Sequence, residues 1–259
     1  MSNLQGSLQL LRLLKTGYLT IIGTNLVGIY LHGSYVMHAY NESVSDLDYI
    51  VVVRQPLSFS AKSQLLAYTV NQLWPLSPKK GLEFHVLLLK DTHHFVDPLP
   101  FDLHFSQMHY QEYLMNNTEY ISKMQGVDPD LAAHLTIINH FGQVLIGPPV
   151  KTVFSPVPEA VYWQSILFDI NDAEREIVNQ PMYVILNLCR ALAFKNDHLI
   201  TSKLSGGQWA LTHLSNTKYQ LINAAISDYT GTGASKALTC YSSRELQDFA
   251  NHMLKLIRQ

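Results

Sequence analysis

Two stretches decide the fold: residues 26–34, LVGIYLHGS, and residues 45–53, SDLDYIVVV. Each contains an apolar run of strand length, over residues 26–31 and 49–53. The first run leads into Gly33 and Ser34, which favour a turn, and the second follows Asp46 and Asp48. Side chains two residues apart on a strand point to the same side, so the two carboxylates are expected to project together.

This pairing of a turn with two carboxylates indicates a site for a nucleoside triphosphate and its metal. Adjacent carboxylates repel each other unless a cation lies between them, and Mg²⁺ prefers carboxylate, phosphate and water oxygens. Gly33 lets the backbone approach a phosphate closely, and the Ser34 hydroxyl can donate to it. Either motif alone also occurs by chance in loops and turns.

A third carboxylate, Glu83, lies in the apolar run of residues 82–89, LEFHVLLL. A charge there would be costly if it faced a core, so Glu83 is expected to face the site. It could bind the metal or take a proton from a hydroxyl, and the neighbouring carboxylates are expected to raise its pKa. The alternative is a strand-edge glutamate in solvent.

These residues resemble the nucleotidyltransferase superfamily, whose best-known fold member is DNA polymerase β. Within it they resemble the aminoglycoside adenylyltransferases that modify streptomycin and spectinomycin, in a branch with a helical C-terminal domain of unknown specificity. The matching segments stand in the family's order and span nearly the whole chain: residues 31–34 (LHGS), 45–48 (SDLD), 82–84 (LEF), 128–131 (DPDL), 184–190 (VILNLCR), 202–203 (SK) and 207–209 (GQW).

The resemblance implies Mg²⁺-dependent transfer of AMP from ATP to a hydroxyl. It implies that Asp46 and Asp48 hold the metal and that Glu83 is the base. ATP would lie between two domains, and the family positions that contact it fall, besides Gly33, on Ser34, Ser45, Arg190, Lys203 and Tyr229. Taken alone, the residue types at 190 and 203 are equally typical of surface helix charges.

The family positions that contact the acceptor fall on Gln180 and Met108, where the family has an acidic residue and a tryptophan. A neutral amide cannot pair with a guanidinium as a carboxylate does, which disfavours streptomycin. Asp169, Asp172 and Glu176 are expected on one helix face that would attract a polycationic acceptor, although a solvated face explains them equally well.

The composition fits a small cationic acceptor. The chain has 259 residues, 47% of them hydrophobic, with a net charge of −2, which gives no basis for holding a nucleic acid. Cys189 and Cys240 lie far apart and are expected to be reduced thiols in a cytoplasmic monomer. No apolar run approaches the roughly 18 residues of a membrane span. Residues 93–94, His104 and His109 are expected in loops or at the surface.

The predicted architecture is an α/β domain over residues 1–150, with a mixed polymerase β-like sheet, followed by an all-helical domain over residues 151–259. Prolines and glycine in residues 147–149 and 155–158 mark the boundary. The pattern predicts strands at 26–31, 49–53 and 82–89, and helices at 8–20, 62–73, 111–124, 130–141, 160–178, 183–194, 209–214, 218–229 and 243–257.

Two other functions stay open at this point. One is a nucleotidyltransferase that modifies a protein side chain with AMP, as antitoxin-like members of the superfamily do. The other is a non-catalytic relative that only binds nucleotide. Retention of all three carboxylates, Asp46, Asp48 and Glu83, favours an enzyme, and the complete helical domain favours a small acceptor, which links the chain to antibiotic resistance.

Overall fold

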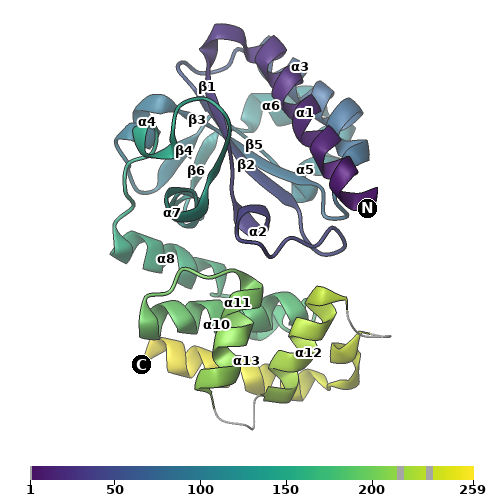
Figure 1. The fold of residues 1–259 in the computed structure, drawn as a ribbon, viewed down its shortest axis with the longest axis vertical. Helices are drawn as coiled ribbons and strands as arrows, with labels where there is room; N and C mark the ends of the chain where they lie inside the picture. The colour runs from purple at the N-terminus through teal and green to yellow at the C-terminus, as the bar shows by residue number, and fades with distance from the viewer. Residues whose placement is uncertain (1, 215–218, 232–235) are drawn as a thin grey trace. The chain divides into compact units, whose positions relative to one another are not determined.

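The computed structural model describes residues 2–214, 219–231 and 236–259. It divides into two compact units, Met1–Tyr162 and Trp163–Gln259 (Figure 1). The first unit is a mixed sheet with helices and the second is helical, so the predicted fold class is confirmed. The predicted boundary at residue 150 stays a prediction.

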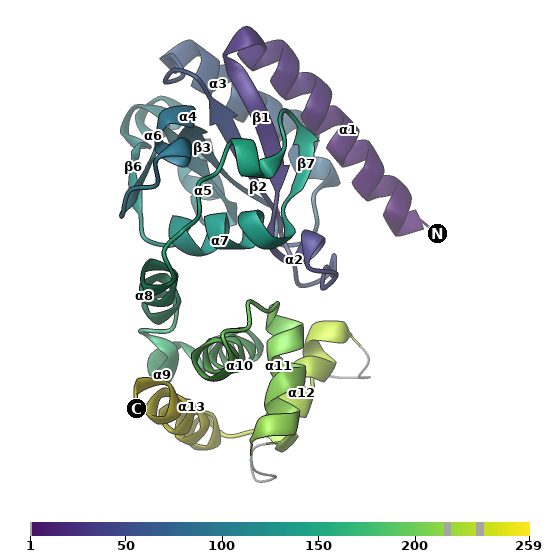
Figure 2. The ribbon, with the colours of Figure 1, turned by 60° about the vertical axis from the view of Figure 1, so that its left-hand side comes forward.

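A five-stranded sheet forms the centre of the first unit, in the order β5-β3-β2-β1-β7. Only β2 and β3 run parallel; the other neighbours are antiparallel. Figure 2 shows β7 beside β1. The strands are β1 (Leu26–Leu31), β2 (Leu47–Val53), β3 (Leu82–Leu88), β5 (Leu103–Phe105) and β7 (Gln143–Ile146), and a second sheet pairs β4 (Leu99–Phe101) with β6 (Gly126–Asp128).

Alternate residues of the strands pack into two separate cores, one on each face of the sheet. Tyr49 and Val51 pack into a core on one face of the sheet, while Ile50 and Val52 pack into a core on the other face. The first face is covered by α1 (Ser2–Ile22), α3 (Phe59–Tyr68), α5 (Gln107–Met115) and α6 (Asn117–Lys123), and the second by α7 (Leu131–Phe141). Two short helices, α2 (Gly33–Val36) and α4 (Leu89–His93), follow β1 and β3.

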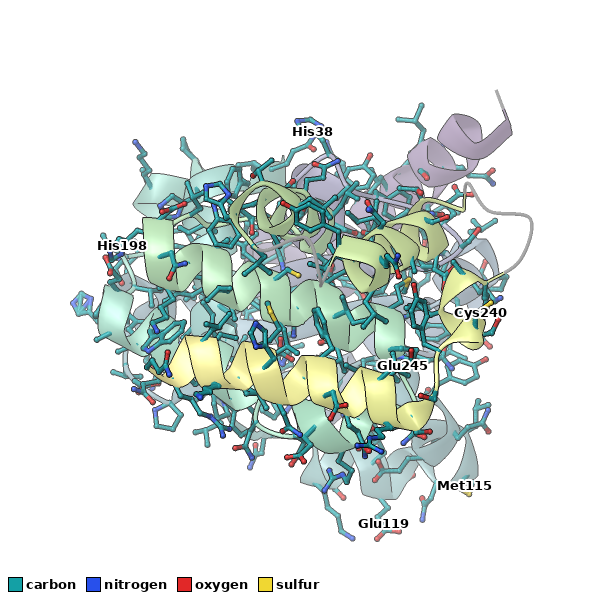
Figure 3. The ribbon with its side chains drawn as sticks, turned by 90° about the horizontal axis from the view of Figure 1, so that it is seen from below. His38, Met115, Glu119, His198, Cys240 and Glu245 are labelled. Atoms are coloured by element: carbon teal, nitrogen blue, oxygen red, sulfur yellow. The ribbon has the colours of Figure 1, made fainter. Side chains whose placement is uncertain are left out.

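The second unit is built around α10 (Pro181–Asp197), which is buried almost continuously from Val184 to Phe194. It packs against α11 (Lys203–His213), α12 (Tyr219–Thr230) and α13 (Ser243–Arg258). Ser242 and Glu245 cap the start of α13 reciprocally. Figure 3 shows Glu245 at that end of the helix, near Cys240. Among the described residues, none of the helices has the length and apolarity that a membrane span needs.

Two long helices predicted from the sequence are each broken in the structure. The predicted helix at 111–124 is α5 and α6, because the Asn116 side chain caps a new helix by accepting from the Glu119 amide at 3.2 Å. The predicted helix at 160–178 is α8 (Glu159–Asp169) and α9 (Ala173–Glu176), separated by a turn. Residue 218, the predicted start of α12, lies outside the described residues.

Candidate functional site

Parallel pairing of β2 and β3 places two of the predicted site residues side by side. Asp48 and Glu83 are direct partners in the register, and Asp46 lies just before β2 begins. One carboxylate oxygen from each of the three residues lies within 4.8 Å of the others. The structure therefore brings Asp46, Asp48 and Glu83 together, as the sequence predicts.

The turn after β1 lies directly against this group. The His32 amide donates to the Asp48 carbonyl oxygen at 3.0 Å, and Gly33 follows with φ +64°. A Cβ atom on Gly33 would lie 1.9 Å from Asp48 Oδ2, so only glycine fits both the backbone conformation and the space. The contact explains why a glycine stands at this point of the turn.

The two serines predicted to contact phosphates differ in their surroundings. The Ser34 hydroxyl is buried and has no hydrogen-bond partner among the described residues, so a phosphate oxygen would satisfy it. Ser45 is also buried, and its hydroxyl accepts from the Asn41 amide at 3.2 Å. Ser45 therefore shapes the loop that leads to Asp46, and its contact with a phosphate stays a prediction.

Glu83 lies among histidines, and the predicted direction of its pKa shift is wrong. Burial raises the pKa of Glu83, but His104, His134 and His85 together lower it more, to about 2. The nearest of them, His104, has its Nε2 atom 3.6 Å from Glu83 Oε1. The Glu83 carboxylate is ionised at neutral pH because its pKa is low, and 29% of the side chain is exposed.

The histidines are the part of the site that sequence reasoning missed. His104 was expected in a loop or at the surface, but it lies on β5 with its ring stacked on His85 at 3.9 Å between centroids. His93 and His94 are exposed, as predicted. The signal in the sequence was the position of His85, two residues after Glu83 and therefore on the same side of β3.

In the second unit, Asp169 gathers several polar side chains. Its carboxylate accepts from the Tyr183 hydroxyl at 3.0 Å, from Asn187, and from Arg190 Nη2 at 3.1 Å. Burial raises the pKa of Asp169, but Arg190 and Lys203 lower it below its usual value. Lys203 Nζ lies 4.4 Å from the centre of the Tyr183 ring. Arg190 and Lys203 are therefore brought together around one carboxylate.

The predicted single acidic helix face is wrong. Asp169 ends α8, whereas Asp172 lies in the turn before α9 and is exposed. Arg175 Nη2 lies 2.9 Å from Asp172 Oδ2, and Arg175 Nε lies 3.0 Å from Glu176 Oε1. The turn after Asp169 ends α8, and Arg175 offsets the negative charge of Asp172 and Glu176. The acceptor-binding roles of Asp169 and Asp172 stay predictions.

The remaining predicted site residues occupy varied positions. Met108, in α5 of the first unit, is 84% exposed. Gln180 is exposed at the start of α10, and Tyr229 is buried in α12, both in the second unit. Their predicted contacts with acceptor and ATP stay predictions.

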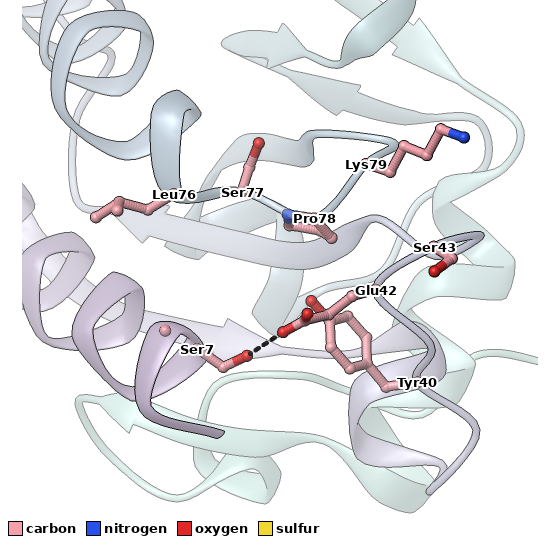
Figure 4. A pocket seen from close by; sticks show the side chains of 9 residues that line it. Ser7, Tyr40, Glu42, Ser43, Leu76, Ser77, Pro78 and Lys79 are labelled. Carbon is pink, nitrogen blue, oxygen red and sulfur yellow. Dashed lines mark hydrogen bonds between the residues drawn. The ribbon is translucent and has the colours of Figure 1, made fainter. Parts of the chain in front are cut away.

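A separate pocket of 380 Å³ in the first unit contains none of the three carboxylates (Figure 4). It lies between the start of α1 and two loops, with Glu42 and Lys79 in its wall. Ser7 Oγ donates to Glu42 Oε1 at 3.4 Å, which ties α1 to one of the loops.

Comparison with known proteins gives a match to a family model and matches to solved structures. Residues 152–256 match the family model described as "Aminoglycoside adenylyltransferase, C-terminal domain". This segment belongs to that domain family. The matched segment contains α8 to α12 and α13 as far as Leu256, and for this segment the family resemblance drawn from the sequence is confirmed.

The fold of almost the whole chain is matched by a solved structure. Spectinomycin adenyltransferase AAD(9) from Enterococcus faecialis, crystallised with ATP and spectinomycin, superposes with a TM-score of 0.81. The match covers 97% of this chain and 99% of that chain at 18% sequence identity. No curated protein sequence matches the chain. At this identity the match shows the fold alone, and the predicted enzyme class, a nucleotidyltransferase, is the one that the family model indicates.

Proposed function

We propose that the protein transfers the adenylyl group of ATP to a hydroxyl of a small cationic acceptor of the aminoglycoside or aminocyclitol class. The observation that carries this proposal is the meeting of Asp46, Asp48 and Glu83 beside the turn at Gly33. The match of residues 152–256 to an aminoglycoside adenylyltransferase domain supports the acceptor class.

The donor set of this group suits magnesium. Asp46 and Asp48 would hold Mg²⁺, because hard carboxylate oxygens are its usual protein ligands beside phosphate and water. When bound, the ion supplies positive charge at the phosphate oxygens and at the departing pyrophosphate. The buried Ser34 hydroxyl is suitably placed beside Gly33 to donate to one of those oxygens.

Glu83 is proposed as the base. Its ionised carboxylate accepts the proton of the acceptor hydroxyl while the acceptor oxygen forms a bond to the α-phosphorus of ATP. The bond between that phosphorus and the bridging oxygen breaks at the same centre, and pyrophosphate leaves with its electron pair. The products are an AMP ester of the acceptor and pyrophosphate.

Arg190 and Lys203 are proposed to attract the triphosphate. Both are cations that lie near the carboxylate of Asp169, and cations attract phosphate oxygens. Gln180 and Met108 are proposed to contact the acceptor. Because Gln180 is neutral, we place spectinomycin before streptomycin among the acceptors.

The decisive experiment incubates the protein with MgATP and, separately, with spectinomycin, streptomycin and other aminoglycosides. Mass spectrometry should find one acceptor whose mass has increased by that of an adenylyl group, with release of pyrophosphate. Glu83→Gln is the matched control, since it keeps the size of the side chain and removes the base. The absence of an adduct over the whole panel, or an equal yield from Glu83→Gln, would overturn the proposal; AMP found on a protein would point to a macromolecular acceptor.

A further inference from the structure

A second group of metal-binding side chains lies next to Glu83 in the first unit. His85 on β3 and His104 on β5 are direct partners in the antiparallel register, and Asp128 ends β6. One potential ligand atom from each of the three lies within 4.8 Å of the others. His85 is only 1% exposed, so the group lies in the interior of the fold and is not a chance cluster on the surface.

Several polar atoms of this region are buried without hydrogen-bond partners among the described residues. They include His85 Nδ1, His104 Nε2 and, on α7, His134 Nδ1. A buried polar atom that lacks a partner is costly, and native proteins leave few of them unless a water or an ion satisfies them. A metal ion could satisfy His104 Nε2, whereas on His85 the nitrogen that lies beside Asp128 is Nε2, which already has that carboxylate as its partner.

The chemistry of the group differs from that of the three carboxylates. Two imidazoles and one carboxylate favour zinc and its neighbours among the transition ions, whereas Mg²⁺ favours oxygen alone. His85 Nε2 lies 3.1 Å from Asp128 Oδ2. Two ligand atoms bound to one tetrahedral ion at about 2.0–2.1 Å are separated by about 3.3 Å, so an ion can replace the proton that this pair shares.

We propose that His85, His104 and Asp128 bind one divalent transition-metal ion of the zinc type, at a site distinct from the group of Asp46, Asp48 and Glu83. Three protein ligands leave a fourth tetrahedral position for water. His85 and Asp128 already have the required spacing, and His104 completes the set from the neighbouring strand.

Binding requires one movement. The rings of His85 and His104 stack with an angle of 9° between their planes, so their lone pairs lie in parallel planes. The His104 ring must therefore turn toward the ion, which takes its Nε2 atom away from Glu83 Oε1, now 3.6 Å distant. If the proposed function holds, zinc should inhibit adenylyl transfer, because Glu83 loses a neighbour; the binding itself does not rest on that function.

The test is calorimetric titration of the intact protein with zinc, in the absence of nucleotide and acceptor. We expect one ion per chain, and at least about tenfold weaker binding by His104→Gln and by Asp128→Asn. His94→Gln, which removes an exposed histidine outside the group, should bind as the unchanged protein does. Asp48→Asn should keep the zinc affinity, and this separates the new site from the carboxylate site.

Cobalt absorption of the unchanged protein gives a second measurement that needs no variant. Intense ligand-field bands of a four-coordinate ion would support the site, and the weak spectrum of the hydrated ion would overturn it. Equal zinc affinity of His104→Gln and the unchanged protein would also overturn it, as would loss of zinc binding in Asp48→Asn alone. Circular dichroism of each variant establishes that the fold is kept.

Discussion

At the scale of single residues, Glu83 combines a strongly acidic carboxyl group with the proposed role of a base. A carboxylate with a pKa of about 2 does not remove a proton from a free hydroxyl. It accepts one only when the hydroxyl becomes acidic as its oxygen bonds to phosphorus. The histidines that lower the pKa of Glu83 therefore favour a proton transfer that is concerted with attack.

The first prediction is that Glu83 produces no acidic limb in the pH profile between pH 8 and pH 5. Its pKa in the folded protein is about 2, below the ordinary 4.5, so the ionised form is lost only as the pH falls toward 2. By the same sign, its contribution to stability is present above about 4.5 and disappears as the pH falls through the folded value. The turnover number at saturating MgATP measures this, and a limb with a midpoint above pH 5 would contradict it.

The second prediction separates two properties of Gly33. Gly33→Ala should lower stability by about 1 kcal/mol through its positive φ, and should also abolish turnover, because the new methyl group displaces Asp48. Gly23 has a similar φ of +61° with no atom within 4 Å of an added Cβ, so Gly23→Ala should cost the same stability and leave turnover intact. Thermal unfolding and the pyrophosphate assay compare the two, and equal turnover would refute the contact.

At the scale of elements, β2 and β3 carry most of what the sequence could predict. Their apolar runs identify the strands to within two residues, and Asp48 and Glu83 interrupt these runs at the start of each strand. The short strands β4 to β7 were not predictable, because three or four residues give no period. His104 lies on one of them, which is why its place beside Glu83 was missed.

The breaks in the predicted helices have a local cause that periodicity does not reveal. The side chain of Asn116 accepts from the Glu119 backbone amide and so starts a new helix. The predicted acidic face fails because a turn separates Asp169, at the end of α8, from Glu176 in α9.

The third prediction concerns the attachment of α3 to the sheet. Lys62 Nζ lies 2.8 Å from Asp102 Oδ1, with only 8% and 7% of the two side chains exposed, and Asp102 Oδ2 also accepts from the Leu57 amide at 2.8 Å. Asp102→Asn leaves the buried lysine charge without its carboxylate and should lower the free energy of unfolding by about 3–5 kcal/mol. Urea unfolding measures it. Arg175→Gln, which breaks exposed pairs, is the control and should leave the midpoint unchanged.

At the scale of the whole molecule, each unit has its own interior. The cores on the two faces of the sheet are drawn from the first unit, while the buried residues of α10 meet those of α11, α12 and α13 in the second. The change from strand-like to helical pattern near residue 150 is visible in the sequence. The choice of acceptor cannot be read from this change of pattern, because specificity depends on side chains from separate elements.

The fourth prediction is that a fragment from Glu159 to the end of the chain folds independently. It keeps α8 whole and contains the complete core around α10, so it should be helical by circular dichroism and melt cooperatively. The matched comparison is the same fragment with Leu188→Ala, which empties a fully buried position in α10 and should lower the melting temperature. A gradual melt without a transition in the unchanged fragment would contradict independence.

The direct pairing of Asp48 with Glu83 has a consequence for how the activity fails on heating. Because the ladder between β2 and β3 sets the spacing of these two carboxylates, loosening of the surrounding side chains alone does not separate them. Amide hydrogen–deuterium exchange of these strands should therefore accelerate at the same temperature at which the proposed binding of magnesium disappears. Thermal inactivation at lower temperatures would then have its origin in the helical unit.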